Sequence, residues 1–167
     1  MFKRAESDAD YQAFGALCRN YVDWCRDRYS DIPWLVEEVF GYQALDAELD
    51  QLSKKYGAPQ GLTLLAYDGA ILLGGGAFQR FGDGVCELKR VFVTDEAKGR
   101  GVGRKLTVAL IDEARAAGCH TMLLDTGDRL TEARALYESL GFAYVDPYRV
   151  YPERLLPFLV FMEKRIA

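Results

Sequence analysis

The segment over residues 86–106, CELKRVFVTDEAKGRGVGRKL, is the feature that most limits how this chain can fold. Its first half alternates apolar and charged side chains, as a β-strand with two different faces does. A short polar turn follows, and glycines then open an amphipathic helix. The first turn of a helix leaves backbone N–H groups without partners, and the helix dipole adds positive potential there. The segment therefore predicts a strand that feeds an anion-binding helix start, suited to a phosphate-bearing molecule.

The composition is that of a globular protein. The chain has 167 residues, of which 50% are hydrophobic and 28% charged, and this predicts a single domain over residues 1–167. A net charge of −4 and a pI of about 5.1 argue against a nucleic-acid partner. The longest apolar stretch, residues 155–162, contains a proline and is too short to span a membrane, so we expect no membrane partner.

The N-terminus and the cysteines bear on location. The first ten residues, MFKRAESDAD, lack the apolar core of a signal peptide, and the four cysteines form no CxxC pair. We therefore expect reduced thiols in a cytoplasmic protein. His120 is the only histidine and has no partner at metal-ligand spacing, so we expect no metal.

The apolar spacing predicts the order of the elements. Helices are expected over residues 8–29, 43–55, 101–117 and 131–140, and strands over residues 2–6, 62–67, 71–81, 85–93, 121–125, 142–145 and 157–163. This order predicts an α/β fold, a single mixed, twisted sheet of about seven strands flanked by about four helices. In the strand over residues 85–93, alternation places Glu87, Lys89, Val91 and Val93 on one face.

The glycines fit neither of two common nucleotide-binding motifs. A P-loop needs Gly-Lys followed by Ser or Thr, which the chain lacks. A dinucleotide fingerprint would need a glycine at position 104 or 106, where Arg104 and Leu106 stand. What remains is a pair of glycines at positions 101 and 103, with Lys98 three residues before the first of them.

This pattern resembles the acyl-CoA signature Q/R-x-x-G-x-G/A of the GCN5-related N-acetyltransferase (GNAT) family, with Lys98 in place of Gln or Arg. The preceding strand, ELKRVFV, is similar to the fourth strand of that family, and residues 133–142, ARALYESLGF, resemble its closing helix motif. The segments follow the family's order between about residues 62 and 163. Leu130 departs from it, because many members have Asn there. The resemblance implies a GNAT-like acyl-CoA N-acyltransferase fold.

The resemblance also implies a function. The chain would transfer an acetyl group from acetyl-CoA to a primary amine of a small molecule or peptide by direct attack; a longer acyl group stays open. Residues 61–167 would form the cofactor-binding and catalytic core, and residues 1–60 would frame the acceptor. The residues implied to hold the pyrophosphate and pantetheine of acetyl-CoA are Val91, Phe92, Val93, Lys98, Gly99, Arg100, Gly101, Val102, Gly103 and Arg104.

The transfer needs proton movements. A primary amine with a pKa of ~10.4 must lose a proton before it attacks a thioester, and the departing thiolate needs an acid. Tyr137 occupies the family's tyrosine position and is the implied acid, although it could equally be a core aromatic. Glu87 is the candidate base. Alternatively, Glu87 is only an ion-paired strand residue beside Lys89, and a chain of water molecules acts as the base.

The acceptor remains unidentified at this point. Acidic and aromatic side chains of the first helix and the following loop suit a cationic amine, although they could also be a solvated face with core tryptophans. These residues are Asp23, Trp24, Asp27, Tyr29, Asp31 and Trp34. Two rival functions stay open, namely a non-catalytic acyl-CoA sensor and a protein-interaction module on the same fold. The oligomeric state, a homodimer included, also stays open.

Overall fold

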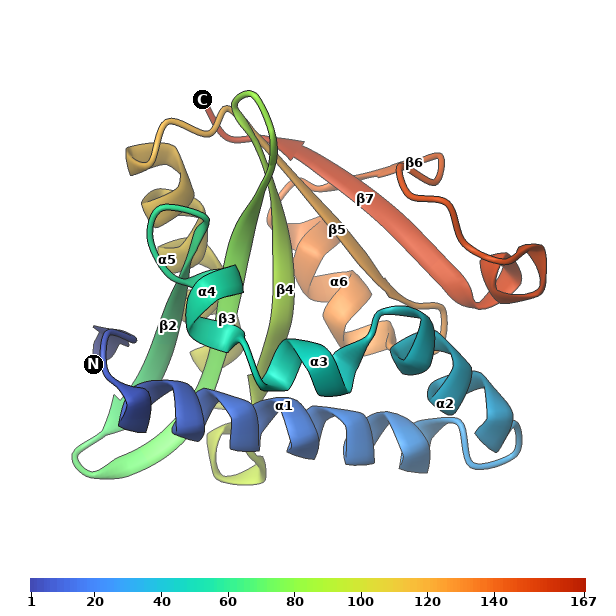
Figure 1. Cartoon of the computed structure of the whole chain (residues 1–167), viewed down its shortest axis with the longest axis horizontal. Coiled ribbons are helices and arrows are strands. Elements are labelled where there is room, and N and C mark those ends of the chain that lie inside the picture. Colours follow the sequence, from blue (N-terminus) through green and yellow to red (C-terminus); the bar gives the residue numbers. More distant parts are fainter.

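A seven-stranded mixed sheet forms the centre of the molecule, and the computed structural model describes residues 1–167 (Figure 1). Its strands are β1 (Phe2–Arg4), β2 (Gly61–Asp68), β3 (Ile71–Gly82), β4 (Val85–Val93), β5 (Thr121–Gly127), β6 (Ala143–Val145) and β7 (Leu159–Arg165). The helices are α1 (Asp8–Arg28), α2 (Pro33–Tyr42), α3 (Leu45–Leu49), α4 (Leu52–Tyr56), α5 (Val102–Ala116) and α6 (Thr131–Ser139), with 3-10 turns η1 (Asp95–Ala97) and η2 (Glu153–Phe158). The expected α/β fold is confirmed.

The sheet is split between β4 and β5. The strand order is β1-β2-β3-β4-β5-β7-β6, and only the β4–β5 pair is parallel. Residues 85–87 pair with residues 121–123, and no pairing follows beyond them. The two strands then diverge, as Figure 1 shows. The result is a gap in the middle of the sheet that backbone hydrogen bonds do not close.

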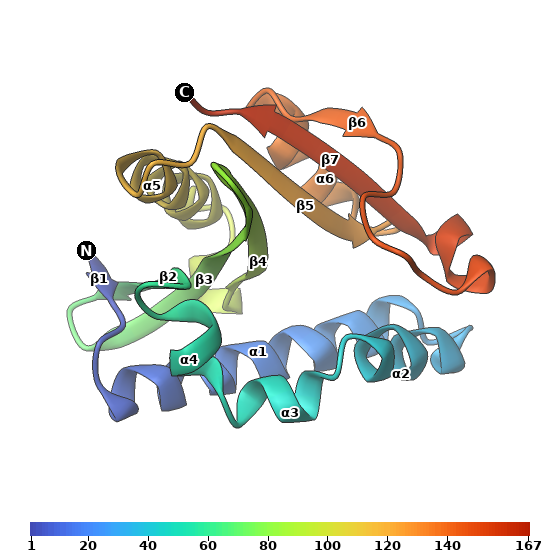
Figure 2. The same cartoon turned by 45° about the horizontal axis from the view of Figure 1, so that its top comes forward.

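Helices cover both faces of the sheet. α1 to α4 lie together along one side (Figure 2), where Phe14 and Leu17 of α1 pack with Leu65 of β2. α5 and α6 pack on the other face, where Leu110 of α5 shares a core with Leu64, the neighbour of Leu65. Adjacent strand residues thus belong to opposite cores, as the alternation of a strand requires.

The helices after residue 32 differ from the expectation. The single helix expected over residues 43–55 is wrong, because α3 and α4 are separate and Ala44, before α3, has a left-handed φ of 53°. A helix that was not expected, α2, begins at Pro33, whose fixed φ suits a first helical position. α6 begins after Leu130, and no side-chain hydrogen bond caps the helix.

A bulge in β4 changes which side chains share a face. Ala77 pairs with Lys89 and Gly75 pairs with Phe92, so two residues of β4 lie opposite Gly76. Arg90 carries the irregular backbone, with a φ of 55°. The expected alternation is therefore wrong after Lys89. Val91 and Val93 face α5, whereas Glu87, Lys89 and Arg90 face the side of α1 to α4.

Candidate active site

A cavity of about 750 Å³ occupies the gap between β4 and β5. β4 contributes residues 88–93 and β5 contributes residues 124–127, while α1 and α2 close one side and the starts of α5 and α6 the other. Of the 34 residues that line the cavity, 21 are hydrophobic. A large, mostly apolar cavity with a few polar groups is typical of a small-molecule site.

One end of this cavity is the start of α5. Gly99 and Gly101 have φ values of 72° and 71°, which only glycine adopts without strain, and Gly101 caps the helix without a side chain. The backbone N–H groups of five residues find no acceptor in the protein, namely those of Gly99, Gly101, Val102, Gly103 and Arg104. Five free donors at a helix N-terminus form an anion-binding cradle.

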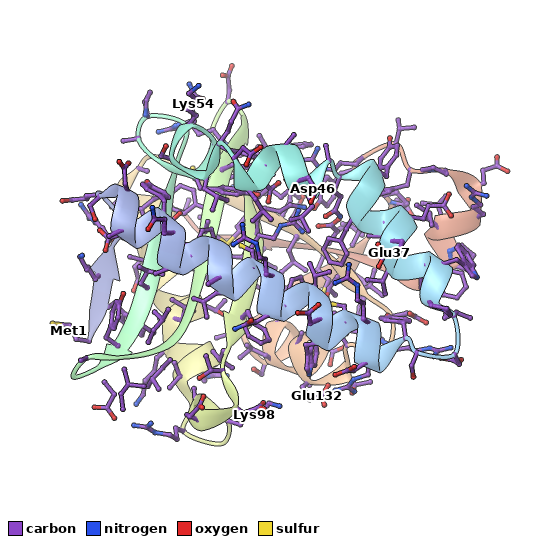
Figure 3. All side chains as sticks on the ribbon, turned by 60° about the horizontal axis from the view of Figure 1, so that its bottom comes forward. Met1, Glu37, Asp46, Lys54, Lys98 and Glu132 are labelled. Carbon is purple, nitrogen blue, oxygen red and sulfur yellow. The ribbon has the colours of Figure 1, made fainter.

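Nine of the ten residues that the resemblance implied for the cofactor line this cavity. They are Val91, Phe92, Val93, Lys98, Gly99, Gly101, Val102, Gly103 and Arg104. The tenth, Arg100, does not line it and instead pairs with Asp68 at 2.7 Å. Figure 3 shows Lys98 and Glu132, which both line the cavity, at the same edge of the molecule.

The walls next to the cradle suit an extended ligand. Beyond Glu87, the edge of β4 that faces β5 has no strand partner, so its backbone groups are free to pair with amide groups of a ligand. A Cβ atom at Gly103 would make only ordinary van der Waals contacts, at 3.7 Å from Val93 Cγ1 and 3.9 Å from Leu136 Cδ2. The absence of a side chain at Gly103 therefore leaves space in the cavity that no other protein atom fills.

Tyr137 of α6 lies in the cavity wall. It is almost fully buried, and its ring packs edge-on against Phe142 with centroids 5.6 Å apart. Burial, followed by the negative charge of Asp125, raises the pKa of the Tyr137 phenol well above its usual range. The phenol thus keeps its proton at neutral pH and is able to donate it.

Glu87 does not line the cavity. Its carboxylate is fully buried and accepts hydrogen bonds from Gln79 at 2.8 Å, from Tyr148 at 2.9 Å and from Arg149 Nε at 2.9 Å, with Lys89 at 3.3 Å. Burial alone would raise the pKa of Glu87, but Lys89 and Arg149 lower it. A carboxylate held in this way is a poor proton acceptor, and its contacts are those of an ion-paired strand residue.

A group of polar residues that the sequence analysis did not predict lies at the point where β4 and β5 diverge. Asp125 of β5 lines the cavity and accepts hydrogen bonds from Lys89 at 2.8 Å and from Tyr151 at 2.6 Å. Gln43 donates to Tyr151 at 2.9 Å. Lys89 lowers the pKa of Asp125 to about 2 although burial opposes this. Spacing could not find this group, because its members come from β4, β5, the residue that follows α2 and the loop before η2.

The residues expected to frame the acceptor are only partly brought together. Trp24 and Tyr29 line the cavity, but the remaining four do not. Asp23 pairs with Arg26 at 2.7 Å, and Asp31 pairs with Arg129 at 2.5 Å. Trp34 is 45% exposed and packs against Phe158. The acidic cluster expected to attract a cationic amine is therefore not part of this cavity.

The sequence model of the acetyltransferase (GNAT) family matches residues 21–142. The chain belongs to the GNAT family. A Schizosaccharomyces pombe protein named an uncharacterised N-acetyltransferase is 38% identical over 82% of this chain and 88% of its own length. The expected family is thus confirmed.

Solved GNAT structures share the fold. A Klebsiella pneumoniae protein, described as an acyl-CoA N-acyltransferase, is 26% identical with a TM-score of 0.68, over 100% of this chain and 97% of its own. A Salmonella typhimurium acetyltransferase, solved with its cofactor acetyl-CoA, is 23% identical with a TM-score of 0.64, over 100% of this chain and 94% of its own. At 23% identity, the similarity to the Salmonella typhimurium structure shows a shared fold and nothing more.

Three further findings concern metal sites, membrane spans and the cysteines. No group of three or more His, Cys, Asp or Glu side chains is placed to hold a metal ion. None of the helices combines the length and the apolar character that crossing a membrane requires. All four cysteines are buried and unpaired.

Proposed function

We propose that this GNAT protein is an N-acetyltransferase that moves the acetyl group of acetyl-CoA to a primary amine of a small molecule or peptide by direct attack. One observation carries the proposal: the cavity in the β4–β5 gap has five free N–H donors at one end and the protonated phenol of Tyr137 in its wall. One cavity thus contains both a group of N–H donors that can bind the phosphates of acetyl-CoA and a phenol that can donate a proton to the departing thiolate.

The donor would bind along the length of the cavity. The N–H groups of residues 99–104 that lack acceptors would hold the pyrophosphate, with Lys98 and Arg104 adding positive charge. The free edge of β4 near Val91 and Val93 would pair with the amides of the pantetheine arm. The match of residues 21–142 to the acetyltransferase (GNAT) family supports this choice of donor. We leave Arg100 out of the set, because it pairs with Asp68.

The chemistry is one acyl transfer. The amine nitrogen attacks the thioester carbonyl carbon, the C–N bond forms, the C–S bond breaks and the thiolate takes a proton. We assign that proton to Tyr137, because its raised pKa keeps the phenol protonated. The proton lost by the amine passes to water in the cavity rather than to Glu87, whose carboxylate is held by Arg149 and Tyr148.

The proposal is tested by mixing the protein with acetyl-CoA and a panel of amines, amino acids, polyamines and peptides. Release of the CoA thiol, with an acetylated amine seen by mass spectrometry, is the expected result. Saturable acetyl-CoA binding without any transfer would instead favour an acyl-CoA sensor. If the protein neither binds acetyl-CoA nor releases thiol, the proposal is wrong.

A further inference from the structure

A second cavity, of about 370 Å³, lies beside the first on the side of α2, α3 and α4. The two cavities share three lining residues, Gln43, Lys89 and Arg90. The other six are Tyr42, Glu48, Lys55, Gln79, Arg149 and Tyr151. Only 2 of the 9 lining residues are hydrophobic, in contrast to the first cavity. The second cavity is therefore built for a polar or charged group.

The charges around the second cavity do not balance. Four cationic side chains line it, and three carboxylates either line it or pair with those cations. The cations are Lys55, Lys89, Arg90 and Arg149, and the carboxylates are Glu48, Glu87 and Asp125. With four positive and three negative groups, the cluster carries one excess positive charge.

Most of this cluster is out of contact with water. The side chains of Glu48, Glu87 and Asp125 are 2%, 0% and 6% exposed, and those of Lys89 and Arg90 are 7% and 4% exposed. Burying a charge is costly unless a charge of opposite sign accompanies it. The excess positive charge therefore lies at the rim, where Lys55 and Arg149 are each 34% exposed, and it favours the binding of one further anion there.

Arg90 provides an independent sign of a missing partner. Its Nε donates to Glu48 at 2.8 Å and its Nη1 donates to Gln43 at 2.8 Å, but Nη2 is buried and has no acceptor. A buried charged donor left without an acceptor costs more than an ordinary hydrogen bond gains. Arg90 also has the left-handed backbone of the β4 bulge, so the fold holds this side chain between the two cavities at some cost.

We propose that the second cavity binds a carboxylate of the acceptor, so that the amine substrate is a free amino acid or a similar small amino acid derivative. This inference rests on the proposed acetyl transfer. Arg149 and Lys55, each 34% exposed, would admit the carboxylate, and its negative charge would complete the cluster. The amine of the same molecule would lie toward the first cavity, across the shared residues Gln43, Lys89 and Arg90.

Matched acceptors test this inference. L-Alanine, L-leucine, L-methionine, L-glutamine and L-phenylalanine are each compared with their carboxamides at saturating acetyl-CoA, by thiol release. The amine of the carboxamide is less basic than that of the free amino acid, so a larger fraction of it is unprotonated at neutral pH. A higher rate with the free amino acid therefore cannot result from a larger amount of unprotonated amine. We expect kcat/KM for at least one free acid to exceed that for its carboxamide by about 10- to 100-fold, as one charged hydrogen bond provides.

The failures can be told apart. If every carboxamide reacts as well as its acid, the inference is wrong but the acetyl transfer stands. The inference is also wrong if acetyl-CoA binds and no free amino acid reacts. If acetyl-CoA does not bind at all, the proposed function itself is wrong, and the inference with it.

Variants at the rim locate the carboxylate. Arg149→Gln should raise KM for the acid by about 10- to 100-fold and leave KM for the carboxamide and for acetyl-CoA unchanged, while Arg149→Lys should keep much of the affinity. Lys55→Gln, which leaves the Glu87 pairs intact, gives a second test if Arg149→Gln does not fold. An equal effect on acid and carboxamide, or no effect in either variant, would overturn the inference.

Discussion

Lys89 of β4 and Asp125 of β5 form an ion pair of 2.8 Å across the gap in which their strands have stopped pairing. Both side chains are almost fully buried, at 7% and 6% exposed. The last backbone pair is Glu87 with Leu123, so this ion pair stands where the next ladder positions on the same face would meet. The two strands are thus joined by side chains at the point where a ligand cavity replaces their hydrogen bonds.

This pair predicts a pH-dependent loss of stability. The folded pKa of Asp125 is about 2, below its ordinary value of 3.8, so its contribution is fully present above pH 3.8 and is lost as the pH falls toward 2. The contribution is on the order of 2 kcal/mol. Asp125→Asn should be less stable at pH 7 and should lose less stability than the wild type between pH 4 and pH 2, measured by urea unfolding. An identical fall in both proteins would contradict this.

Tyr137→Phe tests the assigned acid. Phenylalanine keeps the ring that packs on Phe142 but removes the phenolic proton, so we expect kcat to fall by about 10²- to 10⁴-fold with the fold intact. Acetyl-CoA affinity, measured by calorimetry, should stay within a few-fold of the wild type. Unchanged kcat would remove Tyr137 from the chemical step and leave it a core aromatic.

Glu87→Gln separates a base from an ion-paired residue. Glutamine has nearly the same shape, but it removes the charge that pairs with Arg149 and Lys89. We expect a less stable protein with a kcat within about tenfold of the wild type. Loss of kcat by the amount expected for a general base, about 10²-fold or more, with an unchanged acceptor KM would restore Glu87 as the base.

Gly101 and Gly103 form a matched pair for the anion cradle. Gly101→Ala places alanine at a φ of 71° and should cost roughly 1–2 kcal/mol of stability. Gly103→Ala should fold as well as the wild type or slightly better, because the position is helical and a Cβ has only ordinary neighbours. Gly103→Ala should nevertheless weaken acetyl-CoA binding by about tenfold or more, since its methyl group occupies room left for the ligand. Unchanged affinity in Gly103→Ala would contradict the proposed position of the pyrophosphate.

The sheet and the glycine segment could be predicted because their signals are local. Alternation places β2, β3 and β4 within one or two residues, and the glycines at positions 101 and 103 stand directly at the start of α5. Gly74, Gly75 and Gly76 within a strand also predict a bulge or a close approach by another group. A Cβ on Gly76 would lie 2.9 Å from Leu110 Cδ1, and the register shifts there.

What the sequence could not predict depends on contacts between distant residues. The bulge at Arg90 reverses the facing of Val91, and no residue of β4 itself marks it, since a positive φ is unusual for arginine. Glu87 carried a carboxylate at a plausible strand position, but only the fold brings Arg149 against it, 62 residues away. The second cavity has the same origin, because its lining residues come from α2, α3, α4, β3, β4 and the loop before η2.

Titration of the protein with acetyl-CoA in a calorimeter tests whether the cavity in the β4–β5 gap is an acetyl-CoA site. The free N–H groups of residues 99–104 and the cavity that follows them predict saturable binding at one site, with an affinity in the micromolar to millimolar range. Gly103→Ala should bind more weakly in the same titration. No detectable binding of acetyl-CoA at millimolar concentration by the folded wild-type protein would contradict the account.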